Sequence, residues 1–323
     1  MIEVKNLVKR YGDHVAVNNL SFTVEEGQIY GFLGPNGAGK STTMNIITGY
    51  LASTEGEVLI NGHNILEEPE EAKKCIGYLP ELPPVYTDMT VLEYLKFVAE
   101  LKKIPKDQRK KQILEVMNLV KITDMQNRLI KNLSKGYRQR VGLAQAVLGY
   151  PPIIILDEPT VGLDPKQIIE IRELIRELAK KHTVILSSHI LAEIREVCDF
   201  ILIISKGKLV ASDTPDRLEE KMSGTETVEI LAKASAAEVR AILLNVEHIS
   251  NIHTQERADK TCSARIQTEG GCDIREALFF AFAKNECPLL ELQTSRISLE
   301  EVFLELTQND AVGEEERTNA GNL

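Results

Sequence analysis

The hydrophobic pattern of the N-terminal part predicts short strands that lead into a helix. Apolar runs at Ile2–Val8 and Leu20–Val24 flank the turn residues Tyr11–Asp13, so we expect an antiparallel pair at one edge of a sheet. A third apolar run, Gln28–Leu33, ends in a glycine-rich turn, and Lys40–Thr48 then has a helical pattern. This region therefore predicts a strand, a glycine-rich loop and a helix in direct succession.

The middle of the chain changes from a helical to an alternating pattern. From about residue 88 to 150 the apolar positions, such as Val91, Leu95 and Val98, recur once per helical turn, which predicts an inserted helical subdomain. Beyond it strands and helices alternate, which favours an α/β fold with a parallel sheet covered by helices. We expect strands at Glu57–Ile60, Ile76–Leu79, Ile153–Leu156, Thr183–Ser187 and Phe200–Ile204, and helices at Pro165–Lys181 and Ile190–Val197.

The residues after Gly224 predict a second, smaller domain. The patterns follow the order β-α-β-β-α-β, which is typical of a ferredoxin-like α+β fold. We expect the first domain at 1–220, the second at 225–307, and a disordered tail at 308–323, where Glu, Gly and Asn leave nothing to bury. The elements expected are Thr227–Leu231, Ala236–Leu244, Ile249–Thr254, Cys262–Gln267, Ile274–Lys284, Leu289–Thr294 and a last amphipathic helix at Ser298–Leu306.

Composition and charge narrow the class of protein. The 323 residues are 43% hydrophobic and 27% charged, as in a globular protein with more than one core. A formal net charge of -10 disfavours nucleic acid as a partner and a direct approach to anionic lipid. Apolar runs are far shorter than the ~18 residues of a spanning helix, so neither a signal peptide nor a membrane anchor is expected. The five cysteines are scattered, as in a reducing cytosol.

A phosphate-binding loop follows the strand Gln28–Leu33. Residues 34–41 match G-x-x-x-x-G-K-[ST], in which backbone N–H groups close around phosphates at a helix N-terminus. Lys40 would supply positive charge and Ser41 a ligand for Mg²⁺. The nucleotide-binding residues expected here are Gly34, Pro35, Asn36, Gly37, Ala38, Gly39, Lys40, Ser41 and Thr42.

Two acidic residues end the strand Ile153–Leu156. Asp157 would lie at the carboxyl end of the strand, where open α/β sheets bind ligands, and would hold Mg²⁺ directly or through water. Glu158 would polarise the water that attacks the γ-phosphate. An Asp–Glu pair at the end of a strand is, by itself, usually just part of a solvated turn.

Further motifs identify a resemblance to a known family. The segments LSKGYRQR at Leu133–Arg140 and ILDEPTVGLD at Ile155–Asp164, followed by Ser188–His189, resemble those of the ATP-binding cassette (ABC) ATPases over roughly residues 1–220. The resemblance implies a P-loop ATPase fold. It also implies a head-to-tail dimer, of two identical chains or of this chain with another ABC ATPase, in which the signature segment of one subunit covers ATP on the other.

The resemblance also implies a role for each matching residue. Tyr11 would stack on adenine, although a turn tyrosine also packs on a sheet edge. Asp164 would reach across the dimer interface and Ser134 would contact the partner's ATP, although both are equally suited to cap helices. The implied catalytic residues are Lys40, Glu158 and His189, and the implied contacts to the partner's ATP are Ser134, Lys135, Gly136 and Tyr137.

Departures from the commonest motifs point to one subgroup. Lys135 and Tyr137 stand where the signature usually has Gly and Gln, and Glu81 stands where a Gln usually follows the strand. Glu81 could still ligate Mg²⁺. Three segments of this chain resemble those of the ATPases of two-component exporters for drugs, sodium ions or polymers. They are Pro83–Tyr86, Met89–Leu95 and Ile297–Thr307.

These observations predict the ATP-hydrolysing subunit of an ABC exporter that energises a separate membrane permease. It would lie in the cytoplasm, peripheral to the inner face of the cell membrane. One alternative is a regulator that binds ATP without driving transport, which Glu81 alone favours. Another is an ABC ATPase that acts on nucleic acid or ribosomes, for which the sequence offers no zinc cysteines and no basic segment.

Overall fold

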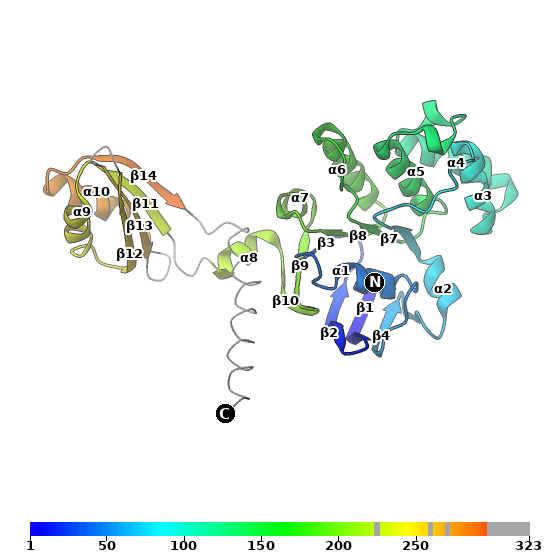
Figure 1. Ribbon diagram of the computed structural model, residues 1–323, viewed down its shortest axis with the longest axis horizontal. Coiled ribbons are helices and arrows are strands. Elements are labelled where there is room, and N and C mark those ends of the chain that lie inside the picture. The colour runs from blue at the N-terminus through cyan, green and yellow to red at the C-terminus, as the bar shows by residue number, and fades with distance from the viewer. Residues whose placement is uncertain (223–226, 258–260, 269–271, 296–323) are drawn as a thin grey trace. The chain divides into compact units, whose positions relative to one another are not determined.

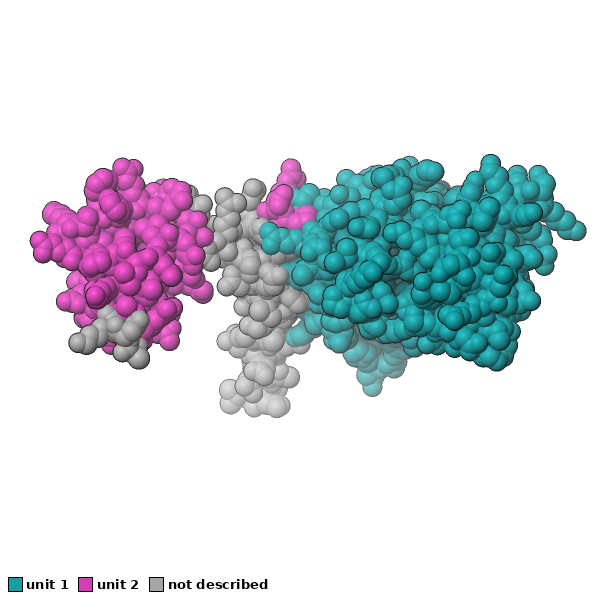
Figure 2. Space-filling view, turned by 90° about the horizontal axis from the view of Figure 1, so that it is seen from above, with its two compact units in different colours: residues 1–214 teal, residues 215–323 magenta. Residues whose placement is uncertain are grey.

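The computed structural model describes residues 1–222, 227–257, 261–268 and 272–295. The chain divides into two compact units, Met1–Thr214 and Pro215–Leu323, coloured separately in Figure 2. Each unit has a hydrophobic core of its own. All the motifs that we expect to carry chemistry lie in the first unit.

A mostly parallel sheet forms the centre of the first unit. Its strand order is β10-β9-β3-β8-β7-β6; β10 runs antiparallel to β9 and the other neighbours are parallel. Strands β3, β7 and β8 are buried along their whole length, which explains their largely unbroken apolar runs. The strands are β3 (Ile29–Leu33), β6 (Ile76–Leu79), β7 (Ile153–Asp157), β8 (Thr183–Ser188), β9 (Phe200–Ser205) and β10 (Lys208–Asp213).

The N-terminal strands form a separate antiparallel sheet with the order β2-β1-β4-β5. The predicted place of the first pair, at an edge of the core sheet, was wrong, because β1 also pairs with the distant β4 and so completes its own layer. The two layers share a core in which the rings of Phe22 and Phe32 lie 5.6 Å apart. The elements here are β1 (Ile2–Tyr11), β2 (His14–Val24), α1 (Lys40–Ile47), β4 (Glu55–Ile60), β5 (His63–Asn64) and α2 (Pro69–Lys74).

Helices cover the opposite face of the parallel sheet. Figure 1 shows α5, α6 and α7 on the side away from α1. The insertion predicted at 88–150 is helical, and its first helix starts at a capping box in which Thr90 and Glu93 exchange hydrogen bonds. The helices are α3 (Val91–Leu101), α4 (Lys106–Leu119), α5 (Lys135–Val147), α6 (Pro165–Ala179) and α7 (Leu191–Val197), with 3-10 turns at Thr123–Met125 and Ile130–Asn132.

The second unit contains an antiparallel sheet with the order β12-β13-β11-β14 and two helices that share its core. Its elements are α8 (Pro215–Met222), β11 (Thr227–Ala232), α9 (Ala236–Leu243), β12 (Ile249–Glu256), β13 (Cys262–Thr268), α10 (Arg275–Lys284) and β14 (Leu289–Ser295). The predictions for Ile297–Thr307, Ser298–Leu306 and 308–323 lie outside the described residues. Within the described ranges, none of the helices combines the length and the apolar character that crossing a membrane requires.

Candidate nucleotide site

The loop between β3 and α1 has the backbone that its glycines predict. Gly37 and Gly39 have φ angles of +83° and +101°, in the left-handed region that favours glycine. A Cβ atom at Gly34 would lie 2.4 Å from the carbonyl oxygen of Ile204, and one at Gly39 would lie 2.5 Å from that of Ala16. The loop therefore needs glycine for its conformation and for the close approach of neighbouring backbone.

Lys40 begins α1 beneath this loop and is 6% exposed. Its Nζ donates hydrogen bonds to the carbonyl oxygens of Gly34 at 2.7 Å and Pro35 at 3.3 Å. Burial lowers the pKa of the Lys40 ammonium, and the negative charges of Glu158 and Asp157 oppose that shift. The site thus holds a fixed cation directly under the phosphate-binding loop.

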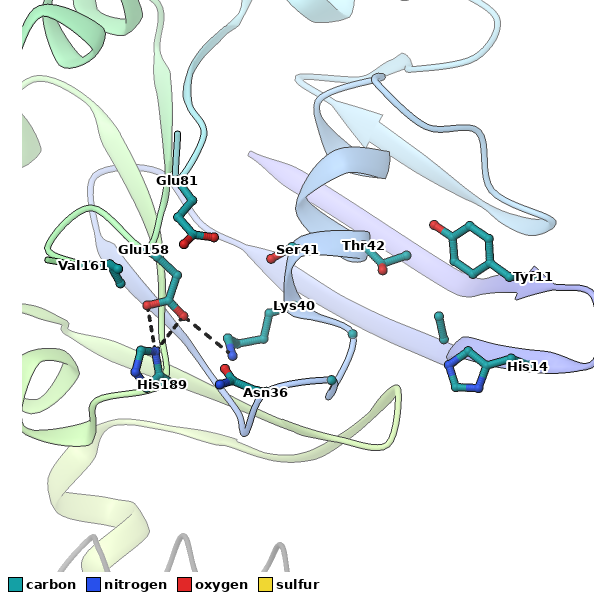
Figure 3. A pocket seen from close by; sticks show the side chains of 13 residues that line it. Tyr11, His14, Asn36, Lys40, Ser41, Thr42, Glu81, Glu158, Val161 and His189 are labelled. Atoms are coloured by element: carbon teal, nitrogen blue, oxygen red, sulfur yellow. Dashed lines mark hydrogen bonds and ion pairs between the residues drawn. The ribbon is translucent and has the colours of Figure 1, made fainter. Parts of the chain in front are cut away.

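Glu158 follows the end of β7 and faces both Lys40 and His189 (Figure 3). One carboxylate oxygen lies 3.8 Å from Lys40 Nζ, and the two oxygens lie 3.0 and 3.1 Å from His189 Nδ1. The residue has a φ of +47°, which is uncommon for a non-glycine residue. The predicted catalytic residues are therefore in one cluster, assembled from α1, the end of β7 and the end of β8.

Asp157, the last residue of β7, is buried beside this cluster. Its Oδ1 accepts a hydrogen bond from Ser187 Oγ at 2.5 Å, and the same Ser187 oxygen accepts the backbone N–H of Glu158 at 3.0 Å. The sequence did not single out Ser187. This hydroxyl ties the ends of β7 and β8 together immediately below Glu158.

A cavity of about 650 Å³ opens over the loop, a size in the range of small-molecule sites. Tyr11 lies at its far end, half-exposed, with Lys9 Nζ 5.3 Å from its ring centre. The predicted residues that line it are Tyr11, Asn36, Gly37, Gly39, Lys40, Ser41, Thr42, Glu81, Glu158 and His189. Gly34, Pro35, Ala38 and Asp157 do not appear in its lining.

The sequence missed His14, Ala16 and Val161, which also line the cavity. The signal for His14 was available, because Tyr11 and His14 pair directly across the hairpin turn between β1 and β2. The antiparallel pair was predicted around this turn, but the pairing across the turn, which places His14 beside the predicted adenine contact, was not followed.

Oxygen atoms gather at the other end of the cavity. Figure 3 shows the Ser41 hydroxyl and the Glu81 and Glu158 carboxylates directed toward a common space near Lys40. Hydroxyl and carboxylate oxygens suit Mg²⁺. Across the described residues, no group of three His, Cys, Asp or Glu side chains forms a metal site by itself. The hydroxyl and carboxylate oxygens at this end of the cavity would suit an ion whose remaining ligands are phosphate and water.

The signature residues and Asp164 lie outside this cavity. Ser134 caps α5 by accepting the Tyr137 N–H at 3.4 Å, and Asp164 caps α6 by accepting the Gln167 N–H at 2.9 Å. A Cβ atom at Gly136 would lie 2.4 Å from Gln167 Oε1. Both capping interpretations left open by the sequence are therefore present, and the glycine lets the two helix starts pack closely.

Known proteins match this chain along its length. The family model described as "ABC transporter" matches residues 17–161. The bacitracin transport ATP-binding protein BcrA of Bacillus licheniformis is 35% identical over 315 residues, which are 97% of this chain and 99% of BcrA. The linearmycin resistance ATP-binding protein LnrL of Bacillus subtilis (strain 168) is 30% identical over 308 residues, 95% and 98% of the two chains.

A solved structure is also similar to this chain. The dimeric post-hydrolysis state of the ATP-binding cassette MJ0796, bound to ADP and Pi, has a TM-score of 0.61 and 28% identity. The match covers 66% of this chain and 98% of that one. The chain therefore belongs to the ABC transporter family, as an ATP-binding subunit that hydrolyses ATP.

Proposed function

We propose that this subunit powers the export of an antibiotic through a separate membrane permease. The observation that carries the proposal is the similarity to BcrA and LnrL, which continues through the second unit over nearly the whole of each protein. Their names assign them to bacitracin transport and linearmycin resistance. The net charge of -10 supports attachment at the inner face of the cell membrane through the permease, not through lipid.

We propose a role for each site residue. Lys40 and the loop amides would hold the phosphates, and Tyr11 would stack on adenine at the far end of the cavity. Ser41 and Glu81 would bind Mg²⁺, and Asp157 would hold the same ion directly or through water. Glu158 would take a proton from the attacking water while His189 fixes its carboxylate. The contacts of Glu158 with Lys40 and His189 support this assignment.

A second ATPase subunit would complete the site. Ser134, Lys135, Gly136 and Tyr137 lie at the N-terminus of α5, away from the chain's own cavity, and α5 would direct its positive end to ATP on the partner. Asp164 would meet the partner at the same interface. The dimeric state of the MJ0796 cassette supports the presence of a second subunit.

The remaining parts of the chain also have proposed roles. Leu82 and Tyr86, which follow β6, are exposed, and with the helical subdomain at 88–150 they would contact the permease. We assign the ATPase domain to 1–220, an accessory domain to 225–307 and a tail to 308–323. The β-α-β-β-α-β order and the sheet order β12-β13-β11-β14 support a ferredoxin-like accessory domain.

The first test compares the purified chain with Glu158→Gln. With saturating MgATP, the variant should hydrolyse ATP about a hundredfold more slowly, because it lacks the general base. It should also accumulate as an ATP-bound dimer in light scattering. Full activity in Glu158→Gln would contradict the role of Glu158.

The export step needs a separate test in cells. Co-expression of the chain with its permease should raise the bacitracin or linearmycin concentration that inhibits a susceptible host, and Glu158→Gln should cancel the increase. The wild-type chain and its permease could leave both inhibitory concentrations unchanged while the purified chain hydrolyses ATP. In that case the proposed antibiotic is wrong but the ATPase assignment stands.

A further inference from the structure

Glu193, in α7, is a buried carboxylate to which the proposed hydrolysis gives no role. It is 4% exposed, and its Oε2 accepts hydrogen bonds from Thr160 Oγ1 at 2.6 Å and Ser188 Oγ at 3.2 Å. Both hydroxyl groups belong to buried residues. A buried carboxylate without hydrogen-bond donors is strongly unfavourable, so these two hydrogen bonds stabilise Glu193 in its buried position.

The two donors lie next to the catalytic pair along the chain. Thr160 comes two residues after Glu158, and Ser188 directly precedes His189. Ser188 Oγ also accepts the backbone N–H of Ile190 at 3.0 Å, so the residues on both sides of His189 are held. Glu193 thus joins the two segments that carry Glu158 and His189.

A second tie lies on the other side of Glu158. Ser187 Oγ bonds both Asp157 and the Glu158 amide, at 2.5 and 3.0 Å. Glu158 itself has the left-handed φ of +47°, a conformation that persists only where the surrounding contacts enforce it. The ties through Ser187 and Glu193 supply such contacts before and after the residue.

We propose that Glu193 is a positioning residue for ATP hydrolysis: by binding Thr160 and Ser188 together, it fixes the spacing between Glu158 and His189. The inference rests on the proposed roles of those two residues. Catalytic groups must be held within about 0.5 Å of productive geometry, and the 3.0–3.1 Å contacts between Glu158 and His189 depend on two separate loops. Among the described residues, the side-chain hydrogen bonds of Thr160, Ser188 and Glu193 do not extend to the phosphate-binding loop. Turnover should therefore suffer more than ATP binding.

The test measures kcat and KM for ATP in the full chain. Glu193→Ala should lower kcat about tenfold or more, because two hydrogen bonds to a charged group are lost. KM should stay within about threefold of the wild-type value. Glu193→Gln keeps an oxygen acceptor in the same place and should retain most of the activity. Glu196→Gln is the matched control, since Glu196 lies in the same helix and pairs with Arg172 at the surface.

The two residues that donate hydrogen bonds to Glu193, Thr160 and Ser188, provide a second set of variants. Thr160→Val removes the hydroxyl at nearly constant volume and should reproduce part of the loss. Combined with Glu193→Ala it should cost less than the sum of the two single changes, because both remove the same contact. Stabilisation by MgATP in thermal unfolding shows that each variant is folded and binds nucleotide. If Glu193→Ala does not fold, Thr160→Val and Ser188→Ala decide the question.

Several outcomes separate this inference from the function on which it rests. If Glu158→Gln is inactive while Glu193→Ala and Thr160→Val turn over within about twofold of wild type, the positioning role is wrong and the base assignment stands. A parallel rise in KM, or equal losses in Glu193→Gln and Glu193→Ala, would also overturn it. Wild-type turnover in Glu158→Gln would remove the proposed base itself.

Discussion

Glu81 changes the charge of the nucleotide site. It lines the same cavity as Glu158 and Ser41, so the site contains a carboxylate where the resembling family usually has an uncharged amide. Nearby like charges disfavour each other unless a cation lies between them. If Mg²⁺ binds here as proposed, a carboxylate at position 81 would bind it more tightly than a glutamine would, and this difference can be measured.

Glu81→Gln should raise the Mg²⁺ concentration needed for half-maximal ATP hydrolysis by about threefold or more, because a charged ligand becomes neutral. At saturating Mg²⁺ its kcat should remain within about threefold of the wild-type value. The measurement is an ATPase titration with Mg²⁺ at constant ATP. Glu67→Gln, an exposed glutamate that does not line the cavity, is the control. Identical Mg²⁺ curves for Glu81→Gln and wild type would exclude Glu81 as a ligand.

At the scale of elements, the contact between α5 and α6 joins the signature segment to the turn after Glu158. Gly136 and Gln167 pack at the start of the two helices. Further along, the buried guanidinium of Arg140 pairs with Glu170 and donates to the carbonyl oxygen of Val120 at 3.0 Å. The Arg140–Glu170 ion pair therefore stabilises the packing of the two helices and fixes their relative orientation.

Glu170→Ala should destabilise the folded chain by about 1–3 kcal/mol, because it leaves the Arg140 guanidinium buried without its carboxylate. Urea unfolding followed by circular dichroism measures the change. Glu173→Ala, an exposed position in the same helix, should change stability by less than about 0.5 kcal/mol. Equal midpoints for the two variants would show that the ion pair adds nothing.

The elements also show which parts of the structure local sequence can predict. The phosphate-binding loop and the Asp157–Glu158 pair were predicted because each is one continuous segment with its chemistry at fixed spacing. The separate N-terminal sheet was not, because the pairing of β1 with β4 joins segments far apart in the chain. Strand β10 and helix α2 were missed because each is short and mostly polar or half-buried.

The same limit applies to the site. Its lining by His14 and Val161, the Ser187 tie and the Glu193 bridge all depend on contacts between separate elements. No spacing along the chain encodes those contacts. The sequence supplied Lys40, Glu158 and His189 as candidates, and the structure brings them close together. The contacts that hold them in place come from the fold.

At the scale of the whole molecule, nucleotide chemistry and the accessory sheet belong to different units. Every residue that lines the nucleotide cavity comes from Met1–Thr214, and each unit has its own core. The first unit should therefore fold and bind ATP without the second.

MgATP should raise the melting temperature of a fragment of residues 1–222 by the same amount as that of the full chain, within about 2 °C. Differential scanning calorimetry of the fragment and the full chain, with and without MgATP, makes the comparison. Lys40→Ala in the fragment is the control that should lose the rise. A fragment that is unfolded, or folded but insensitive to MgATP, would show that the second unit contributes to nucleotide binding.

The left-handed backbone at Glu158 has a consequence beyond catalysis. A non-glycine residue in this conformation costs on the order of 1 kcal/mol, and the surrounding hydrogen bonds must offset that cost. Selection for thermal stability alone would favour glycine at this position, and selection for ATP hydrolysis opposes it. Position 158 is therefore a point of stability–function trade-off, where a more robust protein would be a less capable motor.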